Sequence, residues 1–354
     1  MGVEELTGRE RQVFLSIVRS FIETAEPVGS RHLAKHYHLS CSPATVRNVM
    51  ADLEEKGLIY QPHKSAGRIP TDVGYRQYVD SLMGSASLTK DEKSQIIDEL
   101  ARFSKDVNMV VDTASHVLSS ISSQLGVILA PKFIRGKIAK IELISLSEDN
   151  LLVVFKIELG LVKTVIVEIN RKVPARLLET MKEILNERLH GLSIAEIQQF
   201  IDERFNDVDS ETKILLNLIK EETDKKLNLN STGDIKFSGA KNFLFQPEFE
   251  TREKVGKILE LLDRQDILIR LLNGADAEGV SIIIGEENEE TLMKNCSLIT
   301  TTYRLRGAQG TLGVIGPTRM QYAKIVALVQ FMSEMLGYLM SKPDIDMDQV
   351  ISDL

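Results

Sequence analysis

The chain has 354 residues, 43% of them hydrophobic, which suffices for two or three domains with hydrophobic cores. Its net charge of -8 argues against a protein that binds polyanions with its whole surface, and two cysteines without a CxxC pair indicate neither a disulfide framework nor a zinc ribbon. Because no apolar run approaches the roughly 20 residues of a membrane span and the N-terminus is polar, we expect a cytoplasmic protein with no membrane partner.

Charge is distributed unevenly along the chain. Residues 1–83 carry ten basic and ten acidic side chains, so the entire net charge of -8 lies in the remainder. Within residues 31–76 the balance is positive, with seven Lys or Arg against four Asp or Glu. A locally basic segment joined to an acidic remainder favours nucleic-acid contact by that segment alone.

Three helices are predicted at the N-terminus. Thr7 and Glu10 have the spacing of a capping box, and the apolar stripe that follows predicts a helix over about 8–24. A break at 26–29 precedes a second, short helix. Ser42 is a good N-cap and Pro43 suits the first turn, so a third helix is expected to begin at residue 43 and to stop at Gly57.

The third helix has two distinct faces. One is apolar and consists of Val46, Val49, Met50 and Leu53. The opposite face begins with Ala44 and Asn48, flanked by Thr45 and Arg47. Small side chains, one guanidinium and one amide suit a helix inserted into a DNA major groove, where Arg pairs with guanine and Asn with adenine. The alternative for an isolated helix of this kind is an ordinary amphipathic helix with a solvated polar face.

A two-stranded hairpin is expected after the third helix. Residues 58–60 and 68–70 read as short strands, and the tip between them contains Lys64 and no acid. Three helices followed by such a hairpin form the winged helix-turn-helix arrangement, with the hairpin along the backbone or in the minor groove. The alternative is a winged helix that contacts another protein.

The remainder predicts an α+β body. After a small-residue linker at 84–87, a helical region long enough for two helices that meet near residue 104 extends to about 125. Four runs of strand pattern follow and are expected as an antiparallel succession. Helical pattern returns over 174–227. Residues 235–237 then read as a lone strand. Strand pattern resumes at 280–285, 297–305 and 311–315, around a helix expected over about 251–272, and a last helix is expected over about 320–340. A helical block between two halves of one antiparallel sheet indicates an insertion, whose apolar surface would be buried internally or across a dimer.

Four stretches resemble the family of heat-inducible transcription repressors, HrcA. They read SPATVRNVMADLEEKGLI, QPHKSAGRIPTDVGYRQYVD, AKNFLFQPEF and GVIGPTRMQYAKI. The resemblance covers almost the whole chain, and GRIPTDxGYRxYVD is its most specific string.

The resemblance implies a multidomain α+β homodimer with a winged-helix head, a GAF-like antiparallel domain and a mostly helical dimerisation domain inserted into it. It also implies repression of chaperone operons, of the chaperonin and DnaK type, through an inverted-repeat operator in double-stranded DNA called CIRCE. A GroEL-type chaperonin would maintain the active repressor and heat shock would release repression. The implied boundaries are 1–83 for the head, 84–104 for a linker and connecting helix, 105–170 and 242–341 for the GAF-like domain, 171–241 for the insert and 342–354 for a tail.

The residues expected at DNA are Ser42, Ala44, Thr45, Arg47 and Asn48 on the third helix, with His63, Lys64 and Arg68 on the hairpin. No enzyme, cofactor or metal site is expected, because the HLAKH pair lacks a third ligand and the glycines near 307–316 lack a phosphate-loop pattern. The alternative function keeps the DNA-binding head and makes the GAF-like domain the sensor of a small effector.

Overall fold

The computed structural model divides the chain into two compact units, described separately below. Unit 1 consists of Met1–Leu129, Ile235–Tyr303 and Thr311–Leu354, and unit 2 of Ala130–Asp234 and Arg304–Gly310. The described residues are 6–37, 39, 41–103, 107–131, 137–157, 161–169, 173–193, 196–197, 203–226, 235–274, 279–305 and 308–341. The chain mixes helices with antiparallel sheet, which confirms the predicted α+β, multidomain class. Among the described residues, no helix is long and apolar enough to cross a membrane.

Unit 1 begins with three helices and a minimal two-stranded sheet. The helices are α1 (Gly8–Thr24), α2 (Ser30–His36) and α3 (Pro43–Glu55). The strands β1 (Ile59–Tyr60) and β2 (Ile69–Pro70) pair antiparallel. The order of these elements agrees with the sequence prediction and the predicted bounds are met to within one or two residues. The predicted capping box at the start of α1 is present.

Three further helices lead into the body of unit 1. The first is α4 (Asp72–Gln77), which continues as the π-helical turn η1 (Tyr78–Leu82). Next are α5 (Lys90–Ala101) and α6 (Val107–Ser122), consistent with the two helices that the sequence predicts in this region. These helices end where the strands of the large sheet begin.

The core of unit 1 is a five-stranded sheet with the order β7-β3-β10-β9-β8. Its strands are β3 (Leu125–Leu129), β7 (Ile235–Ser238), β8 (Val280–Ile284), β9 (Cys296–Leu305) and β10 (Ala308–Pro317). The sequence predicts β7 as a lone strand, but it pairs antiparallel with β3. In the sequence, residues 130–234 separate these two paired strands.

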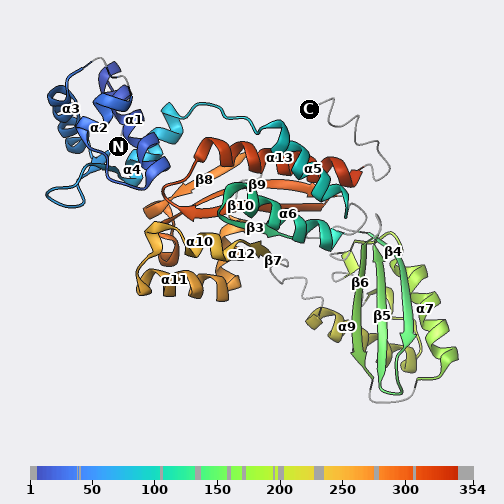
Figure 1. Cartoon of the computed structure of the whole chain (residues 1–354). Coiled ribbons are helices and arrows are strands. Elements are labelled where there is room, and N and C mark those ends of the chain that lie inside the picture. Colours follow the sequence, from blue (N-terminus) through green and yellow to red (C-terminus); the bar gives the residue numbers. More distant parts are fainter. Residues whose placement is uncertain are drawn as a thin grey trace. The chain divides into compact units, whose positions relative to one another are not determined.

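Helices cover both faces of this sheet (Figure 1). One face packs on α10 (Ala240–Leu244), α11 (Arg252–Asp263) and α12 (Gln265–Asn273) through a buried apolar cluster. The predicted single helix over about 251–272 is thus two helices. The short 3-10 helices η3 (Pro247–Phe249), η4 (Gly285–Glu287) and η5 (Thr291–Met293) complete this part.

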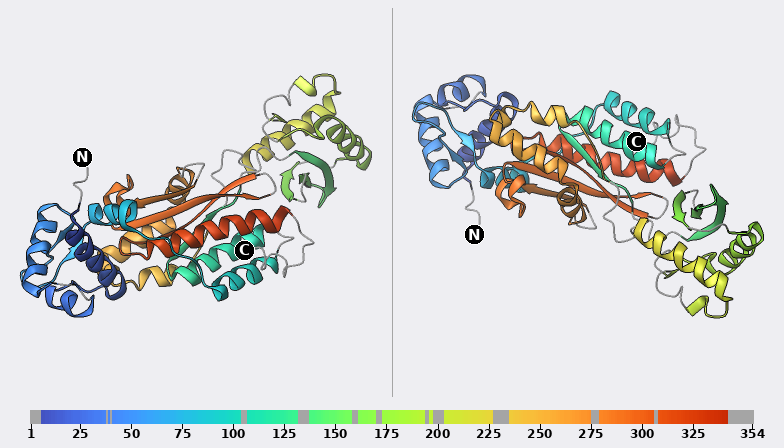
Figure 2. Two further views of the ribbon diagram at one scale, coloured as in Figure 1. Left: turned by 90° about the horizontal axis from the view of Figure 1, so that it is seen from above. Right: turned by 90° about the horizontal axis from the view of Figure 1, so that it is seen from below.

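The opposite face of the sheet packs on α6 and on the last helix, α13 (Tyr322–Ser341). Figure 2 shows α13 in red beside the teal helices α5 and α6. Gly126 of β3 allows the close approach of α6, because a Cβ there would lie 2.4 Å from the carbonyl oxygen of Ser115. Only glycine therefore fits at this crossing.

Unit 2 contains a separate three-stranded sheet. It consists of β4 (Ile138–Ser145), β5 (Asn150–Ile157) and β6 (Leu161–Glu168), each pairing antiparallel with the next. The helices α7 (Ala175–Leu189) and α9 (Ser210–Lys226) contact its two outer strands. The expected succession of four strands in one sheet is therefore wrong, because the first of them, β3, pairs with β7 and β10 in unit 1.

Candidate nucleic-acid interface

The start of α3 is fixed by its own side chains. The Oγ of Ser42 accepts a hydrogen bond of 3.2 Å from the backbone N–H of Thr45 and lies 2.9 Å from the Thr45 hydroxyl. Pro43 occupies the first turn, where no backbone N–H is required. Because the cap satisfies an otherwise free N–H and proline restricts the backbone, this end of α3 is rigid and projects its first turns in one direction.

The two faces of α3 differ as the sequence predicts. Val46 and Leu53 have no exposed surface, and Val49 and Met50 retain only 7% and 5%. Ala44, Arg47 and Asn48 are exposed, and Thr45 is partly buried. Neither the Arg47 nor the Asn48 side chain is used in a hydrogen bond or ion pair recorded within the described part of the chain. Both side chains are thus available to a partner.

Backbone contacts hold the hairpin that follows α3. The Gln61 amide donates to the carbonyl oxygens of Lys64 and Ala66, at 3.0 and 2.9 Å, and so braces the tip. Arg68 and Val28 exchange two backbone hydrogen bonds of 2.9 Å. Gly67 makes this approach sterically possible, because a Cβ at that position would lie 2.4 Å from the Val28 carbonyl group.

The three expected hairpin contacts have different surroundings. His63 and Lys64 are exposed at the tip. Arg68 is less accessible, since its Nε donates to Glu54 Oε2 at 2.8 Å and ties the hairpin to the last turn of α3. The Arg68 guanidinium is therefore already hydrogen-bonded within the protein, and its two terminal nitrogens are the atoms that could bind DNA.

An ion pair between a buried carboxylate and a partly exposed lysine connects the two long helices of this module. Glu10 is 6% exposed and its Oε1 lies 2.9 Å from Lys56 Nζ, at the end of α3. The hydrogen bond from Lys56, with a second from the Thr7 backbone N–H, holds the pKa of Glu10 below its ordinary value despite the opposing effect of burial. The pair keeps α3 in place against α1.

Sequence reasoning missed several contributing residues. Glu54 and Gln61 position the hairpin, but their partners lie across a turn and no spacing rule connects them. Arg76 and Arg319 join this module to the rest of unit 1, through Glu287 and the carbonyl oxygen of Ile22, respectively. In the sequence, Arg76 and Arg319 are marked only by their position in the family-like strings GYRQYVD and GPTRM.

The histidine pair of α2 remains a simple stack. His32 and His36 lie with ring centroids 4.6 Å apart, and His32 Nε2 is 3.5 Å from the Ser20 hydroxyl. Within the described ranges, no group of three or more His, Cys, Asp or Glu side chains could hold a metal ion. Cys296 is buried, and burial raises the pKa of its thiol to about 12, which makes it a poor nucleophile.

Comparisons with known proteins give a consistent result. A family model described as "HrcA protein C terminal domain" matches residues 108–326. A "Heat-inducible transcription repressor HrcA" of Prosthecochloris aestuarii is 37% identical over 352 residues, covering 95% of this chain and 98% of the relative. A protein of the same name from Pelotomaculum thermopropionicum is 37% identical, covering 96% and 98%. A crystal structure described as that of a hypothetical protein is 25% identical, with a TM-score of 0.59 and coverage of 94% and 99%.

Proposed function

Because this chain belongs to the HrcA family of heat-inducible transcription repressors, we propose that residues 1–83 form a winged helix-turn-helix domain that binds operator DNA through α3. The observation that carries this proposal is the exposed first half of α3, which presents Ala44, Arg47 and Asn48 while four apolar side chains anchor the other face. Relatives are named as repressors, and repression requires DNA contact but no catalytic step.

The side chains at the start of α3 fall into two groups, those without a hydrogen-bond partner among the described residues and those already bonded to each other. Arg47 and Asn48 are exposed and would read base edges, Arg on guanine and Asn on adenine. Ala44 would lie against the groove floor, where a larger side chain is excluded. The hydroxyls of Ser42 and Thr45 already bond each other, so we assign them to adjacent phosphates through their remaining valences.

The hairpin would contact the DNA backbone. His63 and Lys64 are exposed at its tip, and Lys64 is suited to a phosphate as a compact point charge. Arg68 would contribute through its terminal nitrogens while Nε stays on Glu54. Phosphate contacts of this kind set the orientation of α3 without reading sequence.

We propose that the body of unit 1 is the GAF-like domain and that the chain forms a homodimer through unit 2, so that the dimerisation insert would begin near residue 130 and not at the expected residue 171. Within the described part of unit 2, the side chains on one face of the sheet are buried and most of those on the other face are partly or fully exposed; the second is called the open face below. On the open face, Ile144, Leu152 and Ile166 lie side by side in register across the three strands. Ile144 and Ile166 are 48% and 47% exposed, and Leu146 beyond the strand end is 52% exposed.

An apolar stripe of this kind fits a second copy of the same surface. A twofold axis through the stripe would place it against the same stripe of a second chain. The ion pairs of Lys140 and Lys156 with Glu142 would then lie at the polar margin of the interface. Asn186 of α7 blocks edge-to-edge pairing at one point, because its amide bonds both the N–H and the carbonyl of Ile141 on β4. We therefore place the dimer contact on the face of the sheet rather than on its edge.

A dimer with two α3 helices requires two half-sites on one face of the duplex, separated by multiples of about 34 Å. This geometry supports an inverted-repeat operator of the CIRCE type at chaperone operons, which the family resemblance implies. The acidic remainder of the chain would limit non-specific DNA binding and leave the basic module as the contact.

We infer that a GroEL-type chaperonin maintains the active repressor because the sheet of unit 1 forms slowly. Its paired strands β3 and β7 are separated in the sequence by residues 130–234. Such non-local pairing slows folding and exposes apolar surface to aggregation. Refolding with and without chaperonin tests this inference, and equal recoveries of soluble, DNA-binding protein would contradict it.

A mobility-shift experiment tests the main proposal. Purified full-length chain is titrated onto promoter fragments of chaperone operons at low salt, with a shuffled sequence of equal length as competitor. We expect the chain to retard a labelled promoter fragment. Unlabelled promoter fragment should compete for the chain, and the shuffled sequence should not. Equal competition by both fragments would contradict sequence-specific binding by α3. The alternative function, in which the GAF-like domain senses a small effector, predicts the same shift but makes it depend on an added metabolite.

A further inference from the structure

Helix α2 carries four cationic or imidazole side chains on one face and no carboxylate. Its seven residues read SRHLAKH, and Leu33 is the side chain buried against the module. At about 100° per residue, Arg31, His32, Lys35 and His36 fall within an arc of about 140° that excludes Leu33. All four side chains are exposed. None of them belongs to the DNA contacts expected on α3 or on the hairpin.

The helices around α2 leave this face positively charged. Helices α1 and α3 pack against α2 (Figure 1), and their carboxylates are Glu10, Glu23, Asp52, Glu54 and Glu55. Glu10 and Glu54 are already paired with a lysine and an arginine of this module. Within the described ranges, none of the five forms an ion pair with a side chain of α2. The other charged side chains of the two helices are the cations Arg9, Arg11, Arg19 and Arg47. This face of α2 is therefore complementary to a polyanion.

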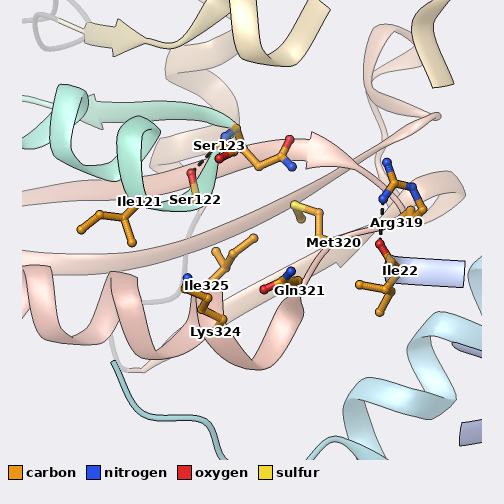
Figure 3. A pocket seen from close by; sticks show the side chains of 10 residues that line it. Ile22, Ile121, Ser122, Ser123, Arg319, Met320, Gln321, Lys324 and Ile325 are labelled. Carbon is orange, nitrogen blue, oxygen red and sulfur yellow. Dashed lines mark hydrogen bonds between the residues drawn. The ribbon is translucent and has the colours of Figure 1, made fainter. Parts of the chain in front are cut away.

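The two imidazoles of α2 are stacked on a supported surface. Their ring centroids lie 4.6 Å apart and their planes differ by 29°. The ring of His32 is 6.4 Å from that of Tyr37, and its Nε2 lies 3.5 Å from the hydroxyl of Ser20 on α1. Figure 3 shows how the end of α1 is held, since Arg319 donates to the carbonyl oxygen of Ile22 at 2.8 Å. The contact of the two rings is thus part of the packing of the module.

Stacked imidazoles respond to both protons and anions. Histidine is the side chain that ordinarily changes charge between pH 5 and 8. Two protonated rings in contact repel each other, and an adjacent anion offsets that repulsion. A protonated ring also donates from both nitrogens, whereas a neutral ring donates from one. A phosphate beside this pair would therefore favour the protonated form and receive stronger hydrogen bonds from it.

We propose that α2 is a further DNA contact, in which Arg31, Lys35 and the stacked pair of His32 and His36 bind backbone phosphates and the pair takes up protons as DNA binds. The helix before the recognition helix crosses the DNA backbone in helix-turn-helix proteins, which suits this position. The proposal rests on the proposed binding of DNA by α3. Because the pair holds protons more tightly in the complex than in the free protein, affinity increases as pH falls. Phosphates carry no sequence information, so operator and random DNA should respond alike.

The pH dependence of binding tests the histidine pair. The affinity of the full chain for operator DNA is measured by fluorescence anisotropy at pH 6, 7 and 8, at constant ionic strength and with a chelator present. We expect affinity to rise about tenfold from pH 8 to pH 6, and the double variant His32→Gln, His36→Gln to lose most of that rise. His63→Gln removes the exposed imidazole of the hairpin tip and should keep most of the rise. His190→Gln, at an exposed position after α7, is the matched control and should keep all of it.

The possible outcomes separate this proposal from the proposed function. If the unaltered chain binds no DNA at any of the three pH values, both are wrong. If it binds DNA with an affinity that does not change with pH, or if the double variant keeps the full rise, only the contact through the histidine pair is overturned.

Two further measurements do not depend on the double variant. Titration calorimetry of the unaltered chain with operator DNA, in two buffers of different ionisation enthalpy, counts the protons taken up at pH 7, and zero uptake would contradict the proposal. Arg31→Gln and Lys35→Gln should each reduce the slope of log affinity against log salt by about 1. Lys241→Gln, at an exposed position on α10, should leave that slope unchanged. Unchanged slopes in both α2 variants would show that this face does not contact phosphate.

Discussion

Arg76 and Glu287 form a two-pronged ion pair that joins α4 to the sheet domain of unit 1. The Nε of Arg76 donates to Glu287 Oε1 at 2.7 Å, and Nη2 donates to Oε2 at 2.5 Å. Nη2 also donates to the carbonyl oxygen of Ile282 on β8. Asp72 adds a second link, because its Oδ2 accepts from the backbone N–H of Glu286 at 2.9 Å. The connecting helix is thus bonded to the edge strand and to the turn that follows it.

The first prediction concerns this pair and its pH dependence. Burial alone would raise the pKa of Glu287, but the hydrogen bonds from Arg76 and from the Ile284 N–H outweigh it, and the net pKa lies below the ordinary 4.5. The stabilisation is therefore fully present above pH 4.5 and is lost as pH falls through the lowered pKa of the folded state. We expect Glu287→Gln to reduce the free energy of unfolding by about 1–2 kcal/mol at pH 7, a value that allows for partial exposure of both side chains.

Urea unfolding at pH 7 and at pH 3 to 4 measures this difference. The gap in unfolding free energy between the original chain and Glu287→Gln should narrow at the lower pH, because below its ordinary pKa the carboxyl group takes up a proton more readily in the unfolded state than in the folded state. Glu289→Gln, at a neighbouring exposed position, is the matched control and should leave stability unchanged at both values. A gap that is constant with pH would rule out the ion pair as its source.

The second prediction concerns Gly67. A Cβ there would lie 2.4 Å from the Val28 carbonyl carbon and oxygen, and backbone atoms cannot rotate away as a flexible side chain can. We expect Gly67→Ala to destabilise the N-terminal module by roughly 1–3 kcal/mol and to displace the hairpin. Gly8→Ala is the control, because nothing lies within 4 Å of the added atom and alanine favours the helix. Thermal unfolding that is identical for the two variants would contradict this account.

Local elements of this fold, and the pairing of strands joined by short turns, could be predicted from the sequence, but the partners of strands distant in the sequence could not. The cap at Ser42 and the left-handed Gly57 fix α3 because both act on neighbouring backbone. The short apolar run of β3 likewise predicts a strand. It does not show that Leu129 pairs with Ile235 rather than with the next strand along the chain, because side-chain period determines the face of a strand and not its neighbour.

The same limit applies to the candidate site. Arg47 and Asn48 could be placed on the outward face of α3 because helical spacing determines direction. Arg68 was expected to be free for phosphate, yet it bonds Glu54, a contact created by the fold of the hairpin over the end of α3. Its role in DNA binding remains a prediction.

The third prediction concerns Lys64, which is exposed at the hairpin tip. Because a phosphate contact carries no sequence information, Lys64→Ala should weaken binding to operator and to random DNA by the same factor. It should also reduce the slope of log affinity against log salt by about 1. Fluorescence anisotropy at several salt concentrations measures both quantities. Lys241→Ala, an exposed lysine on α10, should change neither, and a selective loss on operator DNA in Lys64→Ala would show base contact instead.

The fourth prediction concerns Arg47. If its guanidinium pairs with a base edge, Arg47→Ala should weaken operator binding by about 1–3 kcal/mol and relax the preference at one base pair in each half-site. Binding to a set of operators, each with one base pair replaced, identifies that position. Arg47→Lys keeps the charge and loses the forked geometry, so it should retain binding to random DNA and still lose the preference. Equal losses on operator and random DNA would remove the base-reading role.

The fifth prediction concerns the open face of the unit 2 sheet. Ile144 is 48% exposed and lies in register with Leu152, which in turn faces Ile166. If this stripe is the dimer contact, Ile144→Lys places a charge opposite its own copy in an apolar interface. We expect the dimer to dissociate in analytical ultracentrifugation, while circular dichroism of the variant stays unchanged because the side chain already touches solvent.

A matched control separates this effect from a general change in surface charge. Leu259→Lys replaces a side chain of almost equal exposure, 47%, on α11 of unit 1, and should leave the dimer intact. The dissociated Ile144→Lys chain should also lose operator affinity by more than tenfold, because each half-site would then be bound independently. A variant that remains dimeric would place the contact elsewhere on unit 2 or on unit 1. A monomer with undiminished operator affinity would instead show that two linked heads are not needed.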